Sequence, residues 1–167
     1  ETVAESTLDG VTAPLFFAFL FGPVGAMAYR VVNTLDSMWG HRDKRYLKFG
    51  WASARIDDAA NWIPARLTGL FMAIAALCLR LNSGNAWRVL LRDARKHPSP
   101  NSGFPEAAMA GALCVRIGGT NYYGGEPELR PLIGDPFNVL EPRHIMLANR
   151  LMFATVLLFS LSGFFIL

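Results

Sequence analysis

Carboxylates at a four-residue spacing open the sequence and are the first candidates for chemistry. Glu1, Glu5 and Asp9 would line one face of a helix, because residues four positions apart lie above one another. An apolar segment follows at residues 11–29, and carboxylates that enter such a segment are costly unless they bind a cation or a cationic ligand. The alternative is a solvated amphipathic helix that leads into the apolar segment, and the residues favour neither.

Acidic residues beside two apolar segments are the second candidates. Asp36 follows the first segment, and Asp57 and Asp58 precede the second. Mg²⁺ takes one or two carboxylates together with waters and phosphates, so Asp36 with Asp57 or Asp58 would suit it. Helix capping is the alternative, in which Asp57 and Asp58 are first-turn acids that complement the helix dipole. We expect at least one of them to have that capping role.

A basic group at residues 92–97 is the third candidate. It runs Arg-Asp-Ala-Arg-Lys-His and is followed by Ser99 and Asn101. Arginine makes bidentate contacts to phosphate and lysine supplies a point charge, so this stretch would clamp a nucleotide or a phosphorylated substrate. A basic cluster beside a membrane is by default a topogenic or lipid-headgroup contact, which is the alternative. The sequence contains no Walker A motif, no zinc-type ligand spacing and no Gly-x-Ser-x-Gly motif.

Single histidines and tyrosines add to these groups. His97 is a candidate general acid or base, although His41 and His144 compete for that role. Tyr122 and Tyr123 lie between two glycine pairs, where they would stack on a flat ligand or anchor the segment at a membrane interface.

Three apolar stretches must position these side chains. They cover residues 11–29, 62–79 and 151–167, and each is near the length that a helix needs to cross a hydrocarbon core. The Gly22-Pro23 pair should bend or break the first stretch. A shorter stretch at residues 107–115 is rich in alanine and glycine, which predicts a closely packed helix or a re-entrant segment. Buried helices of a soluble bundle are the alternative for all of them.

The composition favours the membrane interpretation. Hydrophobic residues make up 52% of the 167 residues and charged residues only 17%, against about 25% charged in soluble domains. This composition excludes a disordered chain, and the net charge of +3 is too small to suggest a nucleic-acid partner. We therefore expect an all-α fold: one polytopic helical membrane domain over residues 1–167, with ordered polar loops between apolar helices.

Two polar segments are expected to be those ordered loops. Residues 95–105 hold three prolines and a glycine, which disfavour a helix. Residues 118–125 pair their glycines, which allows close backbone approach to a ligand. Basic residues are dense at 30–66 and again at 80–96. Basic loops usually lie on the cytoplasmic side, but one membrane crossing by residues 62–79 would put these two stretches on opposite sides. The charges therefore leave open whether residues 62–79 cross the membrane.

The polar segments resemble a known family. The resemblance rests on strings that occur in one order: NTLDSM at 33–38, FGWASARIDD at 49–58, NWIPARLT at 61–68, DARKHPSPN at 93–101, PEAAMAGAL at 105–113 and GTNYYGG at 119–125. They resemble the adenosylcobinamide-phosphate synthases of cobalamin biosynthesis, usually called CobD or CbiB, from residue 1 to about residue 135. Members of that family look longer, so we expect the chain to be a C-terminal portion. Two departures stand out: the family's Glu-Asn-Thr-Ser-Asp-Gly is Glu-Ser-Thr-Leu-Asp-Gly at 5–10, and its Gly-Trp-Pro-Glu is Gly-Phe-Pro-Glu at 103–106.

The resemblance implies a specific enzyme. It would be a multi-pass protein of the inner (cytoplasmic) membrane that joins adenosylcobyric acid to (R)-1-amino-2-propanol phosphate, or to aminopropanol, through an amide bond. The resemblance further implies ATP and Mg²⁺ as cofactors. The expected partners are the corrinoid substrate, the aminopropanol substrate, the lipid bilayer and other membrane enzymes of late cobalamin synthesis.

Chemistry then suggests roles for the residues. Forming an amide from a carboxylate requires activation, most simply as an acyl phosphate, neutralisation of phosphoryl charge, and a base for the amine. The candidate catalytic residues are Asp93, Arg95, Lys96, His97 and Glu106, with His97 or Glu106 as the base. The candidate substrate-binding residues are Asn33, Arg66, Asn101, Asn121, Tyr122 and Tyr123. The candidate metal ligands are Glu5, Asp9, Asp36, Asp57 and Asp58.

Two other functions compete with an enzyme. The first is a non-enzymatic membrane scaffold or assembly subunit that keeps the family fold, and a weaker one is a small-molecule transporter. The density of intact polar segments favours the enzyme, because a scaffold has little use for Arg95, Lys96 and His97 together with Asn121 and Tyr122.

Overall fold

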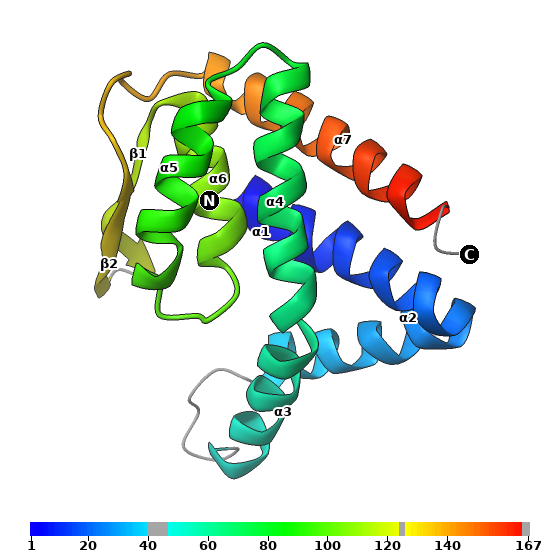
Figure 1. The fold of residues 1–167 in the computed structure, drawn as a ribbon. Coiled ribbons are helices and arrows are strands. Elements are labelled where there is room, and N and C mark those ends of the chain that lie inside the picture. The colour runs from blue at the N-terminus through cyan, green and yellow to red at the C-terminus, as the bar shows by residue number, and fades with distance from the viewer. Residues whose placement is uncertain (40–46, 124–125, 165–167) are drawn as a thin grey trace.

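The computed structural model describes residues 1–39, 47–123 and 126–164, of which residues 39, 47–49, 121–123, 126–128 and 164 are described for their backbone only. This part of the chain is mostly helical (Figure 1). Its elements are α1 (Thr2–Thr7), the π-helix η1 (Leu8–Thr12), α2 (Ala13–Trp39), α3 (Leu47–Ala60), α4 (Trp62–Cys78), α5 (Ser83–Asp93), the 3₁₀ turn η2 (Ala94–Lys96), α6 (Gly103–Leu113), β1 (Arg116–Tyr123), β2 (Glu126–Gly134) and α7 (Arg143–Phe164).

A β-hairpin replaces the second expected loop, so the all-α prediction is wrong for residues 116–134. Strand β1 pairs antiparallel with β2, from Arg116 opposite Gly134 to Tyr123 opposite Glu126. The register is irregular near Gly118, where φ is 91° and a Cβ atom would lie 2.2 Å from the carbonyl oxygen of Pro131. Glycines weaken a strand pattern, and here they mark a bulge, which is why the sequence favoured a loop.

The first expected loop is ordered but shorter than predicted. Turn η2 extends to Lys96 and α6 begins at Gly103, so irregular structure covers only residues 97–102. Pro105 did not prevent the helix, because it lies in the first turn, where backbone N–H groups have no partner within the helix.

Helix α2 folds back on itself, as the Gly22-Pro23 pair predicted. Gly22 adopts φ 66°, and the two arms then lie against each other. The ring of Phe17 stacks on that of Tyr29 with centroids 5.2 Å apart, and Arg30 donates a hydrogen bond to the Asp9 carbonyl. This reversal brings residues near 9 and near 30 to the same place.

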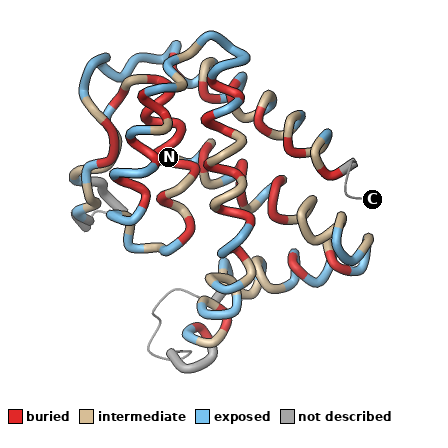
Figure 2. The backbone as a smooth tube through the Cα atoms, in the orientation of Figure 1, coloured by how far each residue is buried: buried red, intermediate tan, exposed pale blue. Residues whose placement is uncertain are grey.

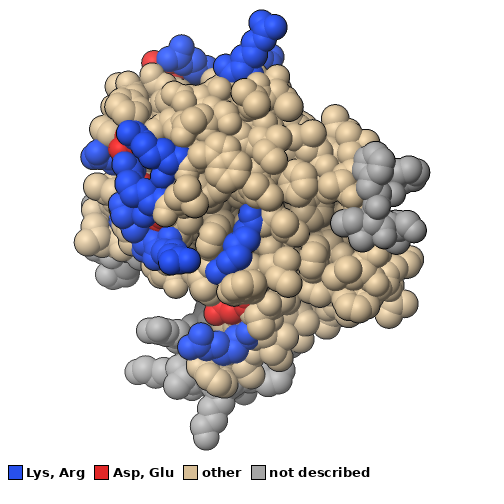
Figure 3. Space-filling model, viewed as in Figure 1, with Lys and Arg blue, Asp and Glu red and all other residues tan. Residues whose placement is uncertain are grey.

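Among the described residues, two helices are long and apolar enough to cross a membrane, and a bent pair would make a third. The two are Thr2–Met38 and Arg143–Gly163, and the pair Gly50–Ala60 and Trp62–Cys78 is bent by 47°. Helix α7 and the reversal of α2 extend to the same side of the molecule (Figure 1). In the same view that side carries no lysine, arginine or acidic side chain, whereas basic residues gather over α5 and the hairpin (Figure 3).

Helix α6 forms the centre of the polar half of the molecule. All of its residues except Phe104 are buried, and it packs on α5, α4 and the hairpin (Figure 2). The sequence prediction of a closely packed helix at residues 107–115 is therefore confirmed. Asn85 of α5 donates from Nδ2 to the carbonyl of Gly111 at 2.8 Å, which fixes the two helices at short range.

Substituting Gly111 by alanine should destabilise this contact. A Cβ atom there would lie 2.7 Å from both the Cα of Ala86 and the carbonyl oxygen of Asn85, which are backbone atoms that cannot rotate away. We expect a loss of about 1–3 kcal/mol in the free energy of unfolding, measured by denaturation in detergent. Gly84→Ala is the control, because its Cβ would meet only an Asn82 oxygen at 3.8 Å. Equal stability of the two variants would contradict the close packing.

Candidate active site

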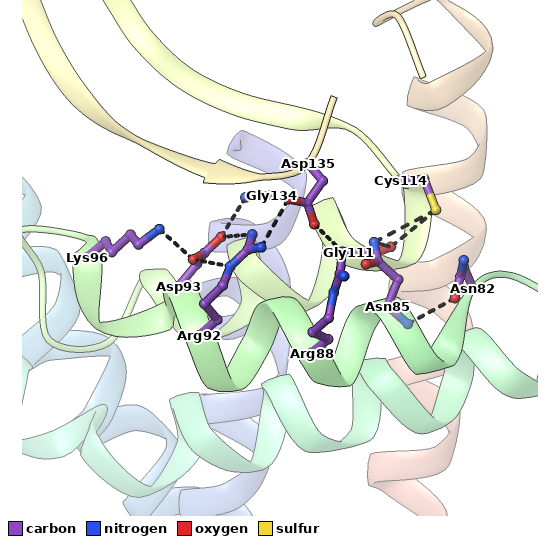
Figure 4. Close-up of polar contacts among 10 residues, drawn as sticks. All are labelled: Asn82, Asn85, Arg88, Arg92, Asp93, Lys96, Gly111, Cys114, Gly134 and Asp135. Carbon is purple, nitrogen blue, oxygen red and sulfur yellow. Dashed lines mark hydrogen bonds and ion pairs between the residues drawn. The ribbon is translucent and has the colours of Figure 1, made fainter. Parts of the chain in front are cut away.

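Asp93 holds the loop between α5 and α6 in place (Figure 4). Its buried carboxylate accepts hydrogen bonds from Arg92 at 2.8 and 2.6 Å and from the Gly134 backbone N–H at 3.0 Å, and it pairs with Lys96 Nζ at 2.6 Å. Burial alone would raise the pKa of Asp93, but the hydrogen bonds from Arg92, Lys96 and Gly134 outweigh it and hold that pKa well below its usual range. Both carboxylate oxygens are occupied, so Asp93 is placed to position the loop and the end of β2.

Two of the expected phosphate-binding cations, Arg92 and Lys96, are already paired. Besides Lys96, Arg92 also contacts Asp135 at 3.0 Å, and Arg88 contacts the other oxygen of Asp135 at 2.6 Å (Figure 4). Sequence reasoning missed Arg88 and Asp135, because their pairing depends on the end of β2 folding over α5. Arg95 is exposed and has no carboxylate within ion-pair distance among the described residues.

Arg66 is held between two aromatic rings and faces Arg95. Its Cζ lies 4.0 Å from the ring centroid of Trp62 and 4.4 Å from that of Phe104. The guanidinium donates to the Trp62 carbonyl at 2.5 Å, and it lies within electrostatic range of Arg95. In the described part of the chain Arg66 has no carboxylate partner either. Two such guanidiniums suit a phosphate, which both can hold through bidentate contacts.

Glu5, His97 and Glu106 come together from three parts of the chain. One potential ligand atom of each lies within 4.8 Å of the others, and His97 Nε2 is 3.9 Å from Glu106 Oε2. The side chains of His97 and Glu106 are 10% and 3% exposed, and within the described part of the chain neither His97 Nε2 nor Glu106 Oε1 has a hydrogen-bond partner. Gly103 permits this approach, since a Cβ there would lie 2.0 Å from the Ala94 carbonyl oxygen.

Burial sets the protonation of this group. Burial, with the neighbouring Glu5 and Glu1 carboxylates, raises the pKa of Glu106 to about 7. Burial also lowers the pKa of His97, against the opposing effects of the Ser99 backbone and Glu5. The backbone N–H of Ser99 donates to His97 Nδ1 at 3.0 Å. A neutral imidazole that accepts at Nδ1 carries its proton on Nε2, so His97 presents a donor to the two glutamates.

A second acidic group joins η1, α2 and α3. Asp57 accepts hydrogen bonds from Asn33 at 3.3 Å and from Asn61 at 2.9 Å. Asp9 lies within electrostatic range of Asp57, Glu5 and Asp36. Among the described residues, however, only Glu5 of the acids nominated for a metal belongs to a group whose ligand atoms lie within 4.8 Å of one another, and its partners there are His97 and Glu106.

The capping interpretation of Asp57 and Asp58 is wrong. Asp57 and Asp58 both lie near the C-terminal end of α3, and the N-cap of α4 is Asn61. The sequence placed these acids at a helix start because it gave no sign of the helix that precedes them. Asp58 faces Arg55 at 3.9 Å, and its backbone carbonyl accepts from Asn101 Nδ2 at 2.8 Å.

Comparison with known proteins agrees with the motifs. Residues 1–152 match the family described as CobD/Cbib protein. The chain belongs to the CobD/CbiB family. Proteins named "Cobalamin biosynthesis protein CobD" are 61% identical over 141 residues in Geobacter metallireducens, 52% over 157 in Pelobacter propionicus and 46% over 158 in Leptospira interrogans. These alignments cover 84%, 94% and 95% of the chain but 44%, 49% and 50% of the relatives, so the chain spans about half their length. No solved structure matches.

The remaining candidate residues of this CobD/CbiB-family chain are only partly described. Asn121, Tyr122 and Tyr123 lie in β1, and their side chains are outside the described residues. His41 also lies outside them. His144 is at the start of α7, where its Nδ1 accepts from the Glu141 backbone N–H at 3.0 Å.

A mostly apolar cavity of about 610 Å³ adjoins the Glu5–His97–Glu106 group in this member of the CobD/CbiB family. Glu106 and Glu1 line it together with apolar residues that include Met109, Leu113 and Ile145. Sequence analysis did not connect α1, α6 and α7 in this way. The cavity could receive the hydrocarbon part of a ligand whose polar end reaches Glu106.

Proposed function

We propose that the chain contributes the active site of an adenosylcobinamide-phosphate synthase, which joins adenosylcobyric acid to (R)-1-amino-2-propanol phosphate. The proposal follows from membership of a family whose curated relatives are named cobalamin biosynthesis proteins. One observation in the structure carries it. Arg66 of α4 contacts Phe104 of α6, and Arg95 of η2 directly precedes the loop, while His97 and Glu106 lie in that loop and in α6; neither arginine has a carboxylate partner in the described part of the chain. A phosphorylated amine needs both an anion site and a proton acceptor.

Carboxylates would hold the proposed Mg²⁺, and ATP is the second proposed cofactor. Mg²⁺ prefers carboxylate oxygens and keeps several waters, and Asp36 and Asp57 lie within electrostatic range of Asp9, with Asn33 donating a hydrogen bond to Asp57. Among the described residues these three acids do not bring ligand atoms within 4.8 Å of one another, so waters would complete the contacts to the ion. ATP, when bound, supplies the activation of the corrinoid carboxylate. Arg95 is the exposed cation that would neutralise phosphoryl charge.

Glu106 is the base in this proposal. The ammonium of the amine substrate must lose a proton before its nitrogen lone pair can attack the activated carboxyl carbon. His97 has no free acceptor nitrogen, because Nδ1 is occupied by Ser99 N–H and Nε2 bears the proton. Glu106 has an unpartnered oxygen and a pKa of about 7, which suits proton transfer at neutral pH. Of the two candidates from the sequence, the geometry thus favours Glu106.

The proposed location is the inner membrane, with several crossings in the complete protein. In the described ranges, two or three helices are long and apolar enough to span a membrane. The corrinoid substrate, lipid and other membrane enzymes of late cobalamin synthesis are the proposed partners. A scaffold without activity is the competing function.

A reconstituted assay tests the proposal. The full-length protein that contains this chain is purified in detergent and incubated with adenosylcobyric acid, (R)-1-amino-2-propanol phosphate, ATP and Mg²⁺. We expect ATP-dependent adenosylcobinamide phosphate, identified by its mass. Absence of product from folded protein would favour the scaffold.

Replacing Arg66 by leucine should weaken binding of the phosphorylated amine. Loss of a charge-assisted contact costs about 1.5–3 kcal/mol, so KM for aminopropanol phosphate should rise about 10- to 100-fold. Arg55→Leu is a matched control, because Arg55 also lies over a tryptophan, Trp51, but pairs with Asp58. A similar KM for both variants would remove Arg66 from the anion site.

The rate should depend on pH through Glu106. Its folded pKa of about 7 means that the carboxyl is protonated, and inactive as a base, below that pH. We expect kcat at saturating substrate to fall below about pH 7 and to level off above it. A kcat that stays constant from pH 5.5 to 8 would contradict the assignment.

A further inference from the structure

We propose that Glu5, His97 and Glu106 form a binding subsite for a primary ammonium group. This inference rests on the proposed function and deepens it, because it assigns one end of the amine substrate to named side chains. The three residues come from α1, the 97–102 loop and α6, and their polar atoms lie within 4.8 Å of one another.

The group is built to receive a cation. In the described part of the chain, no lysine or arginine lies within ion-pair distance of Glu5 or Glu106. Glu106 is 2% exposed, and its Oε1 has no hydrogen-bond partner. A buried carboxylate is costly unless it is paired and hydrogen-bonded. The nearby carboxylate of Glu1 accepts from the Gly118 backbone N–H and lies 3.8 Å from Arg130, which offsets part of its charge.

The hydrogen bonding of His97 argues for an ammonium over a metal ion. A histidine that binds a metal donates its other ring N–H to an acceptor. His97 does the opposite, since Nδ1 accepts the Ser99 N–H, and Nε2 therefore carries a proton toward the glutamates. A metal at Nε2 would need that proton removed, whereas an ammonium needs only the carboxylates as acceptors. The Nε2–H of His97 then has a positioning role toward Glu106.

An ammonium also fits the neighbouring anion site. Phe104 stacks on Arg66, and Glu106 follows two residues later on the same helix. The first turn of α6 therefore carries both the ring that contacts Arg66 and one carboxylate of the subsite.

Binding of two matched compounds tests the subsite. Full-length protein is titrated by calorimetry with (R)-1-amino-2-propanol phosphate and with isopropyl phosphate, which lacks only the amine. We expect the wild type to bind the amine at least about tenfold more tightly, as for a charge-assisted contact. Glu5→Gln and Glu106→Gln should lose this difference and keep the wild-type Kd for isopropyl phosphate. Glu141→Gln, a change at an exposed glutamate paired with Arg143, should keep it.

Results of the titration that differ from the expected one also decide between the possibilities. If the glutamine variants still prefer the amine, the subsite is overturned while the proposed function stands. If the wild type binds neither compound, the proposed function itself fails, and the subsite with it. Stoichiometric Zn²⁺ or Mn²⁺ in the wild type, lost in both variants, would replace the ammonium by a metal. If Glu106→Gln no longer binds isopropyl phosphate because it misfolds, the half-buried Glu5→Gln decides the question.

Discussion

Replacing Glu106 by glutamine should lower kcat by about 10²- to 10⁴-fold, the usual contribution of a positioned base. Glutamine has nearly the same shape as glutamate, so the buried site of α6 should accept it, but its amide cannot take a proton from the amine. Because Oε1 of Glu106 has no partner in the described structure, the substitution breaks no described hydrogen bond there. The measurement is single-turnover formation of the amide, with Kd for isopropyl phosphate as evidence that the anion site survives.

His97→Gln separates the two candidate bases. If His97 only presents its Nε2–H toward Glu106 at 3.9 Å, a glutamine N–H should replace it in part, and kcat should fall much less than in Glu106→Gln. If the two variants lose activity equally, or His97→Gln loses more, the assignment of Glu106 as the base is wrong.

Replacing Asp93 by alanine should destabilise the fold by about 1–3 kcal/mol, because the buried Gly134 N–H would lose its acceptor. The substitution would leave Arg92 and Lys96 without their partner and the Gly134 N–H without an acceptor. The loop that carries His97 should then lose its attachment to β2. The measurement is the free energy of unfolding in detergent, together with the rate of proteolysis in residues 94–102.

The pH dependence of stability checks the same anchor. The pKa of Asp93 is lowered from its ordinary value of 3.8, so its stabilisation is present above that pH and is lost as the pH falls through the folded pKa. Asp58→Ala is the control, because exposed pairs contribute at most about 1 kcal/mol. An Asp93→Ala protein with wild-type stability and no activity would instead make Asp93 a catalytic residue, as the sequence suggested.

The described fold follows the sequence where local patterns were strong. The apolar stretches became α2, α4 and α7, the Gly22-Pro23 pair became the reversal in α2, and the Ala- and Gly-rich stretch became α6. The hairpin at residues 116–134 was not predicted, because its glycines resemble those of a loop. Gly118 is required at the irregularity in the strand pairing, where the Pro131 carbonyl leaves no room for a side chain, and this contact forms only when the two strands pair.

The candidate site divides in the same way. Residue types and spacing were enough to nominate Glu5, His97 and Glu106, since carboxylates and imidazoles are the side chains that bind metals and accept protons. They did not show that these three meet, because α1, the loop and α6 are joined only by tertiary packing.

The sequence by itself determined the family, the apolar segments and the identity of the charged residues near them, since each depends on local order along the chain. Only the tertiary structure decided which charged side chains are already paired with other side chains of the protein. The anchor consists of Asp93 and its partners Arg92 and Lys96. Among the described residues, neither Arg66 nor Arg95 pairs with an aspartate or glutamate, and Glu106 does not pair with a lysine or arginine. The reason is physical: whether a charged side chain is available to a ligand depends on the partners that folding brings within a few ångströms, and those partners lie far away in the sequence.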